Sequence, residues 1–117
     1  MSLSMSDPVG AVLSTALDGL AYRQRVSADN VANADTPHFT ARTVQFEDSL
    51  RQAAQDGNVA AATPTVGYST AQRGADGNNV DLATETLTAM QSTFSYQLLS
   101  RAVGDHFGLI TTAIGGV

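Results

Sequence analysis

Apolar residues near the start of the chain recur at intervals of three and four positions, which is the spacing of one helix face. This pattern predicts a helix over residues 7–33. Asp7 can cap its first turn, and Pro8 suits the first helical position. Asn33 is expected to end the helix in a left-handed conformation, which asparagine tolerates better than most residues. Residues 1–6 are interpreted as a tag or a disordered start and are left out of the fold prediction.

A second and longer helix is predicted over residues 80–117, with Asp81 as its cap. Gly104 and Gly108 are weak points inside it, because glycine is a poor helix former. Its apolar residues form two stripes that differ in phase. Together with the stripe of the first helix, they are expected to form the seam of an assembly, made of Leu13, Leu17, Leu20, Leu87, Met90, Phe94, Leu98, Val103, Phe107 and Ile110.

The middle of the chain lacks such long stripes. Residues 34–55 are expected to hold a turn, an extended segment and a short helix. Residues 56–79 are rich in Gly, Thr, Ala and Asn and predict a flexible or weakly β-structured loop. The predicted fold class is therefore mainly α, with long N- and C-terminal helices forming an antiparallel coiled-coil-like pair and a short extended or flexible middle segment. Each of the two helices can cover only one face of the other, so the apolar stripes need further partners. Copies of the chain are the simplest source of such partners.

Composition narrows the classes of partner. The chain has 117 residues, a net charge of −5 and six scattered basic residues, all arginine, which argues against binding to nucleic acid. It has no cysteine, so it can form neither disulfides nor thiolate metal sites. The sequence contains no run of about 20 apolar residues, which is the length that a helix needs to span a bilayer. The start of the chain also lacks the pattern of a secretory signal, so export would need another route.

Candidate catalytic and metal-binding residues are few. His38 and His106 match no metal-binding motif and are expected to be structural or solvated. Residues 76–81, DGNNVD, resemble the start of a calcium loop but lack its later ligands, so a turn before the second helix is expected. The adjacent Glu47 and Asp48 would point apart on a helix, which leaves an acidic hydrolase as a remote alternative. The sequence predicts a protein that is not an enzyme and that binds no metal or cofactor.

The stretch ADNVANADTPHF, residues 28–39, raises a separate question. Asn30 lies about one turn before the expected helix end, where the helix itself has no use for a carboxamide. Asn30 is therefore expected either to face solvent or to form hydrogen bonds across a helix or subunit boundary. Pro37 disfavours a helical conformation at Thr36, so the helix cannot continue past this point.

This stretch resembles the signature of the flagellar rod and hook protein family, in which an Asn-apolar-Ala-Asn element precedes Thr-Pro-Gly and an aromatic residue. His38 stands where that family commonly has glycine. Residues 76–114, from DGNNVD to FGLITTAI, resemble the C-terminal part of the proximal rod proteins of this family. The residues that match the signature are Asn30, Val31, Ala32, Asn33, Thr36, Pro37 and Phe39.

The resemblance implies a structural subunit of the bacterial flagellar basal body, located in the proximal rod. It implies export through the flagellar type III apparatus without a cleaved signal, and assembly in the periplasm near the export gate and the membrane ring. The terminal helices would pack with copies of the chain and with other rod proteins into a helical tube that transmits torque and encloses the export channel. The alternative is a small helical adaptor or export-chaperone-like protein that binds partner helices.

Overall fold

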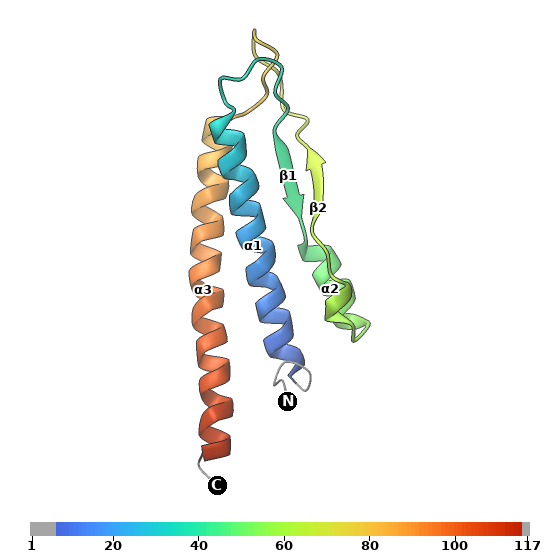
Figure 1. Cartoon of the computed structure of the whole chain (residues 1–117), viewed down its shortest axis with the longest axis vertical. Coiled ribbons are helices and arrows are strands. Elements are labelled where there is room, and N and C mark those ends of the chain that lie inside the picture. Colours follow the sequence, from blue (N-terminus) through green and yellow to red (C-terminus); the bar gives the residue numbers. More distant parts are fainter. Residues whose placement is uncertain (1–6, 116–117) are drawn as a thin grey trace.

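Two long antiparallel helices make up most of the computed structural model, which describes residues 7–115 (Figure 1). Helices α1 (Pro8–Ala32) and α3 (Leu82–Gly115) lie side by side along the long axis of the molecule. The expected mainly α fold with a helix pair is confirmed. The middle segment consists of β1 (Arg42–Gln45), α2 (Glu47–Gln55), a short 3-10 turn η2 (Val59–Ala61) and β2 (Thr65–Tyr68).

Polar residues begin and end α1. The Asp7 carboxylate accepts a hydrogen bond from the backbone N–H of Gly10 at 3.0 Å, which caps the first turn as expected. Asn33 is the C-cap, but its φ of −104° shows that the expected left-handed conformation is wrong. The chain reversal is spread over several residues instead, because Thr36 bonds back to Asn33 through both its N–H and its hydroxyl. The left-handed residue of this turn is His38, with φ of 62°.

Helix α3 is longer than α1, with 34 residues against 25. At a rise of ~1.5 Å per residue, the difference corresponds to roughly 14 Å. The Asp81 carboxylate accepts hydrogen bonds from two backbone N–H groups of the first turn, as a cap does. The helix continues without a break through Gly104 and Gly108. Residues 111–115 are all exposed, so the last turn of α3 has little cover within the chain.

The two strands form a small antiparallel pair that packs on α1, and α2 and η2 connect them along the chain. β1 and β2 are antiparallel, with Val44 opposite Val66. Helix α1 lies between α3 on one side and the strand pair with α2 on the other, and it contacts α3, β1 and α2 (Figure 1). The segment 56–79, expected as a flexible or weakly β-structured loop, thus supplies both β2 and η2.

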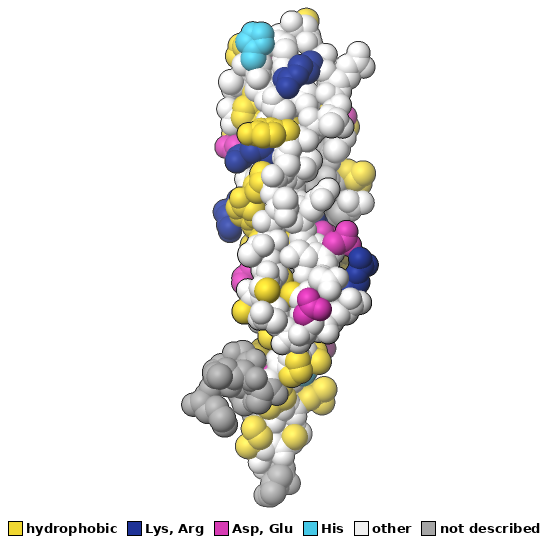
Figure 2. Space-filling view, turned by 90° about the vertical axis from the view of Figure 1, so that its right-hand side faces the viewer, with side chains coloured by type: hydrophobic (Ala, Val, Ile, Leu, Met, Phe, Trp, Pro, Cys, Tyr) yellow, Lys and Arg dark blue, Asp and Glu magenta, His cyan; other side chains and the backbone are white. Residues whose placement is uncertain are grey.

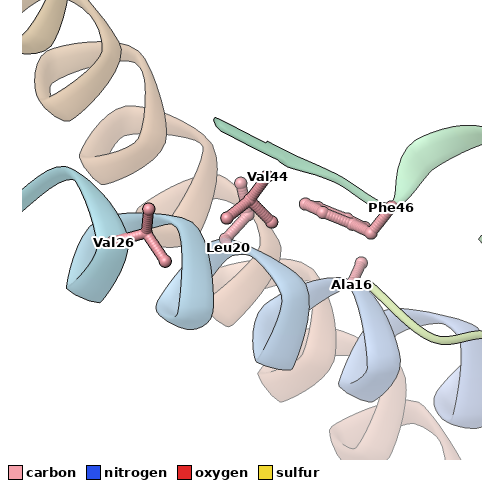
Figure 3. Packing of buried hydrophobic residues seen from close by; sticks show 5 residues of the cluster. All are labelled: Ala16, Leu20, Val26, Val44 and Phe46. Carbon is pink, nitrogen blue, oxygen red and sulfur yellow. The ribbon is translucent and has the colours of Figure 1, made fainter. Parts of the chain in front are cut away.

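The apolar core is small and joins α1 to β1. A Cβ added at Gly19 would lie 2.6 Å from the ring of Phe46, so glycine at this position lets the ring approach the helix closely. The guanidinium of Arg23 lies 4.8 Å from the centroid of the same ring. Figure 3 shows the cluster of buried residues, which is Ala16, Leu20, Val26, Val44 and Phe46. Three partly buried residues pack against this cluster: Tyr22, Leu50 and Leu99.

Candidate functional site

Asn30 is the most completely buried large side chain among the described residues, with 1% of its surface exposed. Its Nδ2 donates hydrogen bonds to the carbonyl of Arg42 at 2.8 Å and to Oε1 of Glu85 at 2.9 Å. Its Oδ1 accepts a hydrogen bond from the N–H of Arg42 at 3.0 Å. The Ser27 hydroxyl donates to the other oxygen of Glu85 at 2.5 Å. We call this group, made of Ser27, Asn30, Glu85 and the backbone of Arg42, the polar clasp.

The polar clasp answers the question that Asn30 raised. A solvent-exposed Asn30 is wrong, and the hydrogen bonds across a helix boundary are present within one chain. The carboxamide also bonds both backbone groups of Arg42, in the way that a neighbouring strand would. One side chain therefore joins α1, β1 and α3, and its poor helix propensity is offset by contacts outside the helix.

The other residues of the family signature have different environments. Val31 and Ala32 are exposed at the end of α1, with Val31 exposing 46% of its surface. Thr36 and Pro37 are exposed in the turn, and Phe39 is half-buried. The N–H of Phe39 bonds to the carbonyl of Thr36, which closes the turn. The signature thus combines one interior residue with a surface turn.

Two asparagines of the DGNNVD stretch hold this turn in place through contacts that the sequence pattern did not predict. The Nδ2 of Asn78 donates to the carbonyls of Asn33 at 2.8 Å and Thr36 at 2.7 Å. The Oδ1 of Asn79 accepts from the N–H of Ala41 at 2.7 Å. Both asparagines are buried. The only signal in the sequence is a pair of asparagines two and three residues before the helix cap Asp81, and it does not reveal which backbone groups they bind.

An ion pair attaches α2 to α1. Arg23 bonds both oxygens of Glu47 at 2.8 Å and also donates to the carbonyl of Val44. The hydrogen bonds from Arg23 lower the pKa of Glu47 to about 2. Asp48 pairs instead with Arg51 on the surface of α2. Each member of the suggested carboxylate pair is therefore held by its own arginine, and the geometry offers no shared acid–base site.

A second polar contact joins α1 to α3 at the end of the helix pair that lies away from the polar clasp. The Nε2 of His106 on α3 lies 2.6 and 2.8 Å from the two carboxylate oxygens of Asp7 at the start of α1. The backbone N–H of Gly10 and then His106 lower the pKa of Asp7. The expectation of a structural role for His106 agrees with this position. Within residues 7–115, no group of three or more His, Cys, Asp or Glu residues could hold a metal ion.

The predicted seam residues separate into three sets by exposure. Leu20 is buried in the core, whereas Leu13, Leu17, Val103, Phe107 and Ile110 are half-buried. The remaining four expose between 53% and 66% of their surface, and we call them the α3 ridge: Leu87, Met90, Phe94 and Leu98.

The α3 ridge points away from α1. At ~100° per residue, its members lie roughly 120–160° around the helix from Ser92, which is buried. Residues 86–100 contain no charged side chain at all, so this exposed face lacks the charges that a solvent-facing helix normally carries. Figure 2 shows the opposite side of the molecule, with the strands and α2 toward the viewer, and there hydrophobic side chains gather at the narrow end where α3 extends beyond the rest.

An open groove borders the ridge between α1, the start of α2 and α3. It is lined on one wall by Leu20, Arg23 and Glu47 and on the other by Ser92 and Phe94. No helix among the described residues is both long and apolar enough to cross a membrane. The ridge and the groove together make this side of α3 the candidate site for a partner.

Comparisons with known proteins point to one group. The chain is 30% identical over 107 residues to the flagellar basal body rod protein FlgB of Cereibacter sphaeroides, which covers 80% of this chain and 84% of that protein. It is 29% identical over 120 residues to FlgB of Borrelia hermsii, covering 84% and 89%. It is 28% identical over 117 residues to FlgB of Bacillus subtilis strain 168, covering 89% and 91%. No family model matches the chain.

Proposed function

The chain belongs to the family of the flagellar basal-body rod protein FlgB, and we propose that it is a structural subunit of the proximal rod that assembles through its terminal helices. Its partners are copies of itself and other rod proteins. In this proposal it leaves the cell body through the flagellar type III apparatus and assembles in the periplasm, near the export gate and the membrane ring. The assembled helical tube transmits torque and encloses the export channel.

The α3 ridge is the observation that carries this proposal. Four large apolar side chains at helical spacing are more than half exposed, on a helix face without charge. A contiguous apolar patch on a soluble chain marks a surface that another molecule covers. Burial of each such side chain is worth ~1.5–3 kcal/mol. A ridge of four therefore favours association strongly when a second helix packs on it.

The substitution Phe94→Asp tests the proposal. Because Phe94 exposes 62% of its surface, the isolated monomer should fold like the parent, with a change in stability within about 0.5 kcal/mol. In an assembly, the same change places a carboxylate in an apolar contact, at a cost of several kcal/mol. Sedimentation across a concentration series should show that the parent associates and the variant stays monomeric. Cells carrying the variant should export the subunit, build no rod and fail to swim.

Ser100→Asp is the matched control, since it adds the same charge at an exposed position of α3 outside the ridge. It should disturb association much less than Phe94→Asp. Normal swimming of the Phe94→Asp strain, or association of that variant like the parent, would contradict assembly through α3. A parent chain that forms only a defined heterodimer with one partner would favour the adaptor alternative.

A further inference from the structure

The apolar contacts between α1 and α3 do not by themselves select one alignment of the two helices. Their side chains recur every three or four residues, so a slide of one turn, ~5.4 Å, brings similar residues opposite one another. On α3, the half-buried residues Leu99, Val103 and Ile110 all face α1 at this spacing. Something other than apolar packing must therefore distinguish the observed register from its neighbours.

Glu85 is the one buried charged side chain of α3 among the described residues, with 9% of its surface exposed. Both of its oxygens are occupied by donors from α1, which are the hydroxyl of Ser27 and the carboxamide of Asn30. A slide in one direction would carry Glu85 toward Val31 and the exposed end of α1. A slide in the other would carry it toward Arg23, whose guanidinium is already bonded to Glu47 and to the backbone.

Either slide also removes hydrogen-bond partners from the side chains of α1 that bind Glu85. Asn30 keeps its bonds to the backbone of Arg42 but loses the acceptor for its second N–H, and the Ser27 hydroxyl loses the carboxylate to which it donates. A buried polar group without a partner is far more costly than an equivalent apolar contact is favourable. Polar residues inside helix pairs are known to fix register for this reason.

Three other polar contacts could compete for this role. The hydrogen bond from Gln24 to Thr93 joins the two helices but is exposed, so water can replace either partner. Asn78 bonds the turn after α1, but it lies before α3 begins and holds the connecting loop. His106 bonds Asp7 at the far end of the pair, but 23% of its side chain is exposed, so water can replace that partner. None of these contacts is buried between the two helices in the way that Glu85 is.

We infer that Glu85 is a positioning residue that fixes the register of α3 on α1 through Ser27 and Asn30. Because Asn30 also holds β1, the same carboxylate aligns the strand pair with the helix pair. The register decides where the α3 ridge lies along the molecule. That consequence for assembly rests on the proposed function, whereas the register itself is a property of the single chain.

The absence of cysteine from the sequence allows a direct test, because every introduced thiol is unique. Gln24 and Thr93 touch in the observed register, with a hydrogen bond of 3.1 Å between their side chains. The pair Gln24→Cys with Thr93→Cys therefore reports this register. The pairs Gln24→Cys with Ala89→Cys and Gln24→Cys with Gln97→Cys report a slide of one turn in each direction. Dibromobimane, which becomes fluorescent on bridging two thiols, gives the rate for each pair in the dilute full-length protein.

With Glu85 present, the native pair should react at least ~10-fold faster than either shifted pair, which corresponds to one register dominating. In Glu85→Met the three rates should approach one another, while circular dichroism shows the helix content of the parent. Glu85→Gln should restore the preference, since its amide can accept from Asn30 and donate to Ser27. Ser27→Ala, which removes one of the two contacts and cannot disturb the apolar packing, should give an intermediate loss.

Asn78→Ala and His106→Ala are the comparison variants, and both should keep the preference for the native pair. An unchanged preference in folded Glu85→Met, or in Ser27→Ala if Glu85→Met does not fold, would overturn the inference. A loss of preference in Asn78→Ala or His106→Ala that exceeds the loss in Glu85→Met would overturn it as well. These rates are measured on monomers, so they stand or fall independently of whether the chain forms a rod.

Discussion

Asn30 makes three hydrogen bonds that a better helix former could not make, and it makes them where no water reaches. Leucine at this position would favour the helix taken alone. In the folded chain it would leave the backbone of Arg42 and one oxygen of Glu85 without their partner. The local preference and the tertiary contacts therefore oppose each other at this residue, and the tertiary contacts outweigh the helix preference.

Replacing Asn30 by leucine should lower the free energy of unfolding by about 3 kcal/mol, because several buried polar groups lose a partner at once. Urea unfolding of the monomer would measure this. Val31→Leu, at the exposed neighbouring position, should stay within about 0.5 kcal/mol of the parent. Equal stability of Asn30→Leu and the parent would show that the polar clasp does not contribute to the fold.

Glu47 should make part of the stability depend on pH. Its pKa of about 2 in the folded chain lies below its ordinary value of 4.5, so the unfolded state binds its proton first as the pH falls. The contribution of the Arg23–Glu47 pair is therefore fully present above pH 4.5 and is lost as the pH falls toward 2. Because 61% of the Glu47 side chain is exposed, solvent screening limits the effect to at most about 1 kcal/mol.

The measurement compares the parent with Glu47→Gln, by urea unfolding at several pH values between neutrality and the acid limit of the fold. Asp7 and Asp81 also have lowered pKa values, so the stability that they contribute to the fold is likewise lost as the pH falls. The difference between the two proteins isolates Glu47 from them. That difference should shrink as the solution is acidified, and a difference independent of pH would show that the ion pair does not contribute in this way.

At the scale of elements, the helices were predictable and their contacts were not. Apolar spacing and the caps Asp7 and Asp81 identify both long helices, since helix signals are local. The hydrogen-bond partners of Asn30, Asn78 and Asn79 are distant from them in the sequence, so a local sequence pattern cannot predict these contacts. The sequence left the conformation of residues 65–68 open for the same reason. Only the pairing with β1 makes this four-residue segment the strand β2.

The glycines of the two helices should respond in opposite ways to alanine. At Gly104 and Gly108 an added Cβ meets nothing within 4 Å, so each substitution should stabilise the monomer by ~0.8–1 kcal/mol through helix propensity. At Gly19 the added Cβ would meet the Phe46 ring at 2.6 Å, and the resulting overpacking should destabilise by ~1–3 kcal/mol. Urea unfolding of the three variants checks both signs. Stabilisation by Gly19→Ala would mean that the core ring has room to move.

At the scale of the whole molecule, the chain is extended and thinly packed. Its radius of gyration is 17.8 Å, whereas a compact domain of this length has about 13 Å. Its longest extent, 66 Å, is more than twice the next, 26 Å. An extended chain buries little of itself, and here only seven hydrophobic residues are buried among those described. The missing burial is the physical reason to expect partners.

The uncovered end of α3 should therefore gain order from association. In dilute solution the backbone amides of residues 109–115 should exchange hydrogen faster than those near Leu99, which packs against the core. Raising the concentration should slow exchange at 109–115, as neighbouring copies cover them. Hydrogen-exchange mass spectrometry across a dilution series measures this directly. Full protection that persists down to low micromolar concentration would count against assembly at this end.

Two of the polar contacts between α1 and α3 lie near opposite ends of their overlap, one at Glu85 and the other at the Asp7–His106 pair. Two beams that slide freely on each other bend almost as easily as the beams taken separately. Two beams fastened at both ends cannot shear, and they flex together as one thicker beam. The helix pair should thus be stiffer than its slender helices suggest. In a rotating shaft built from such subunits, load applied at one end would reach the other with little loss to bending inside each subunit.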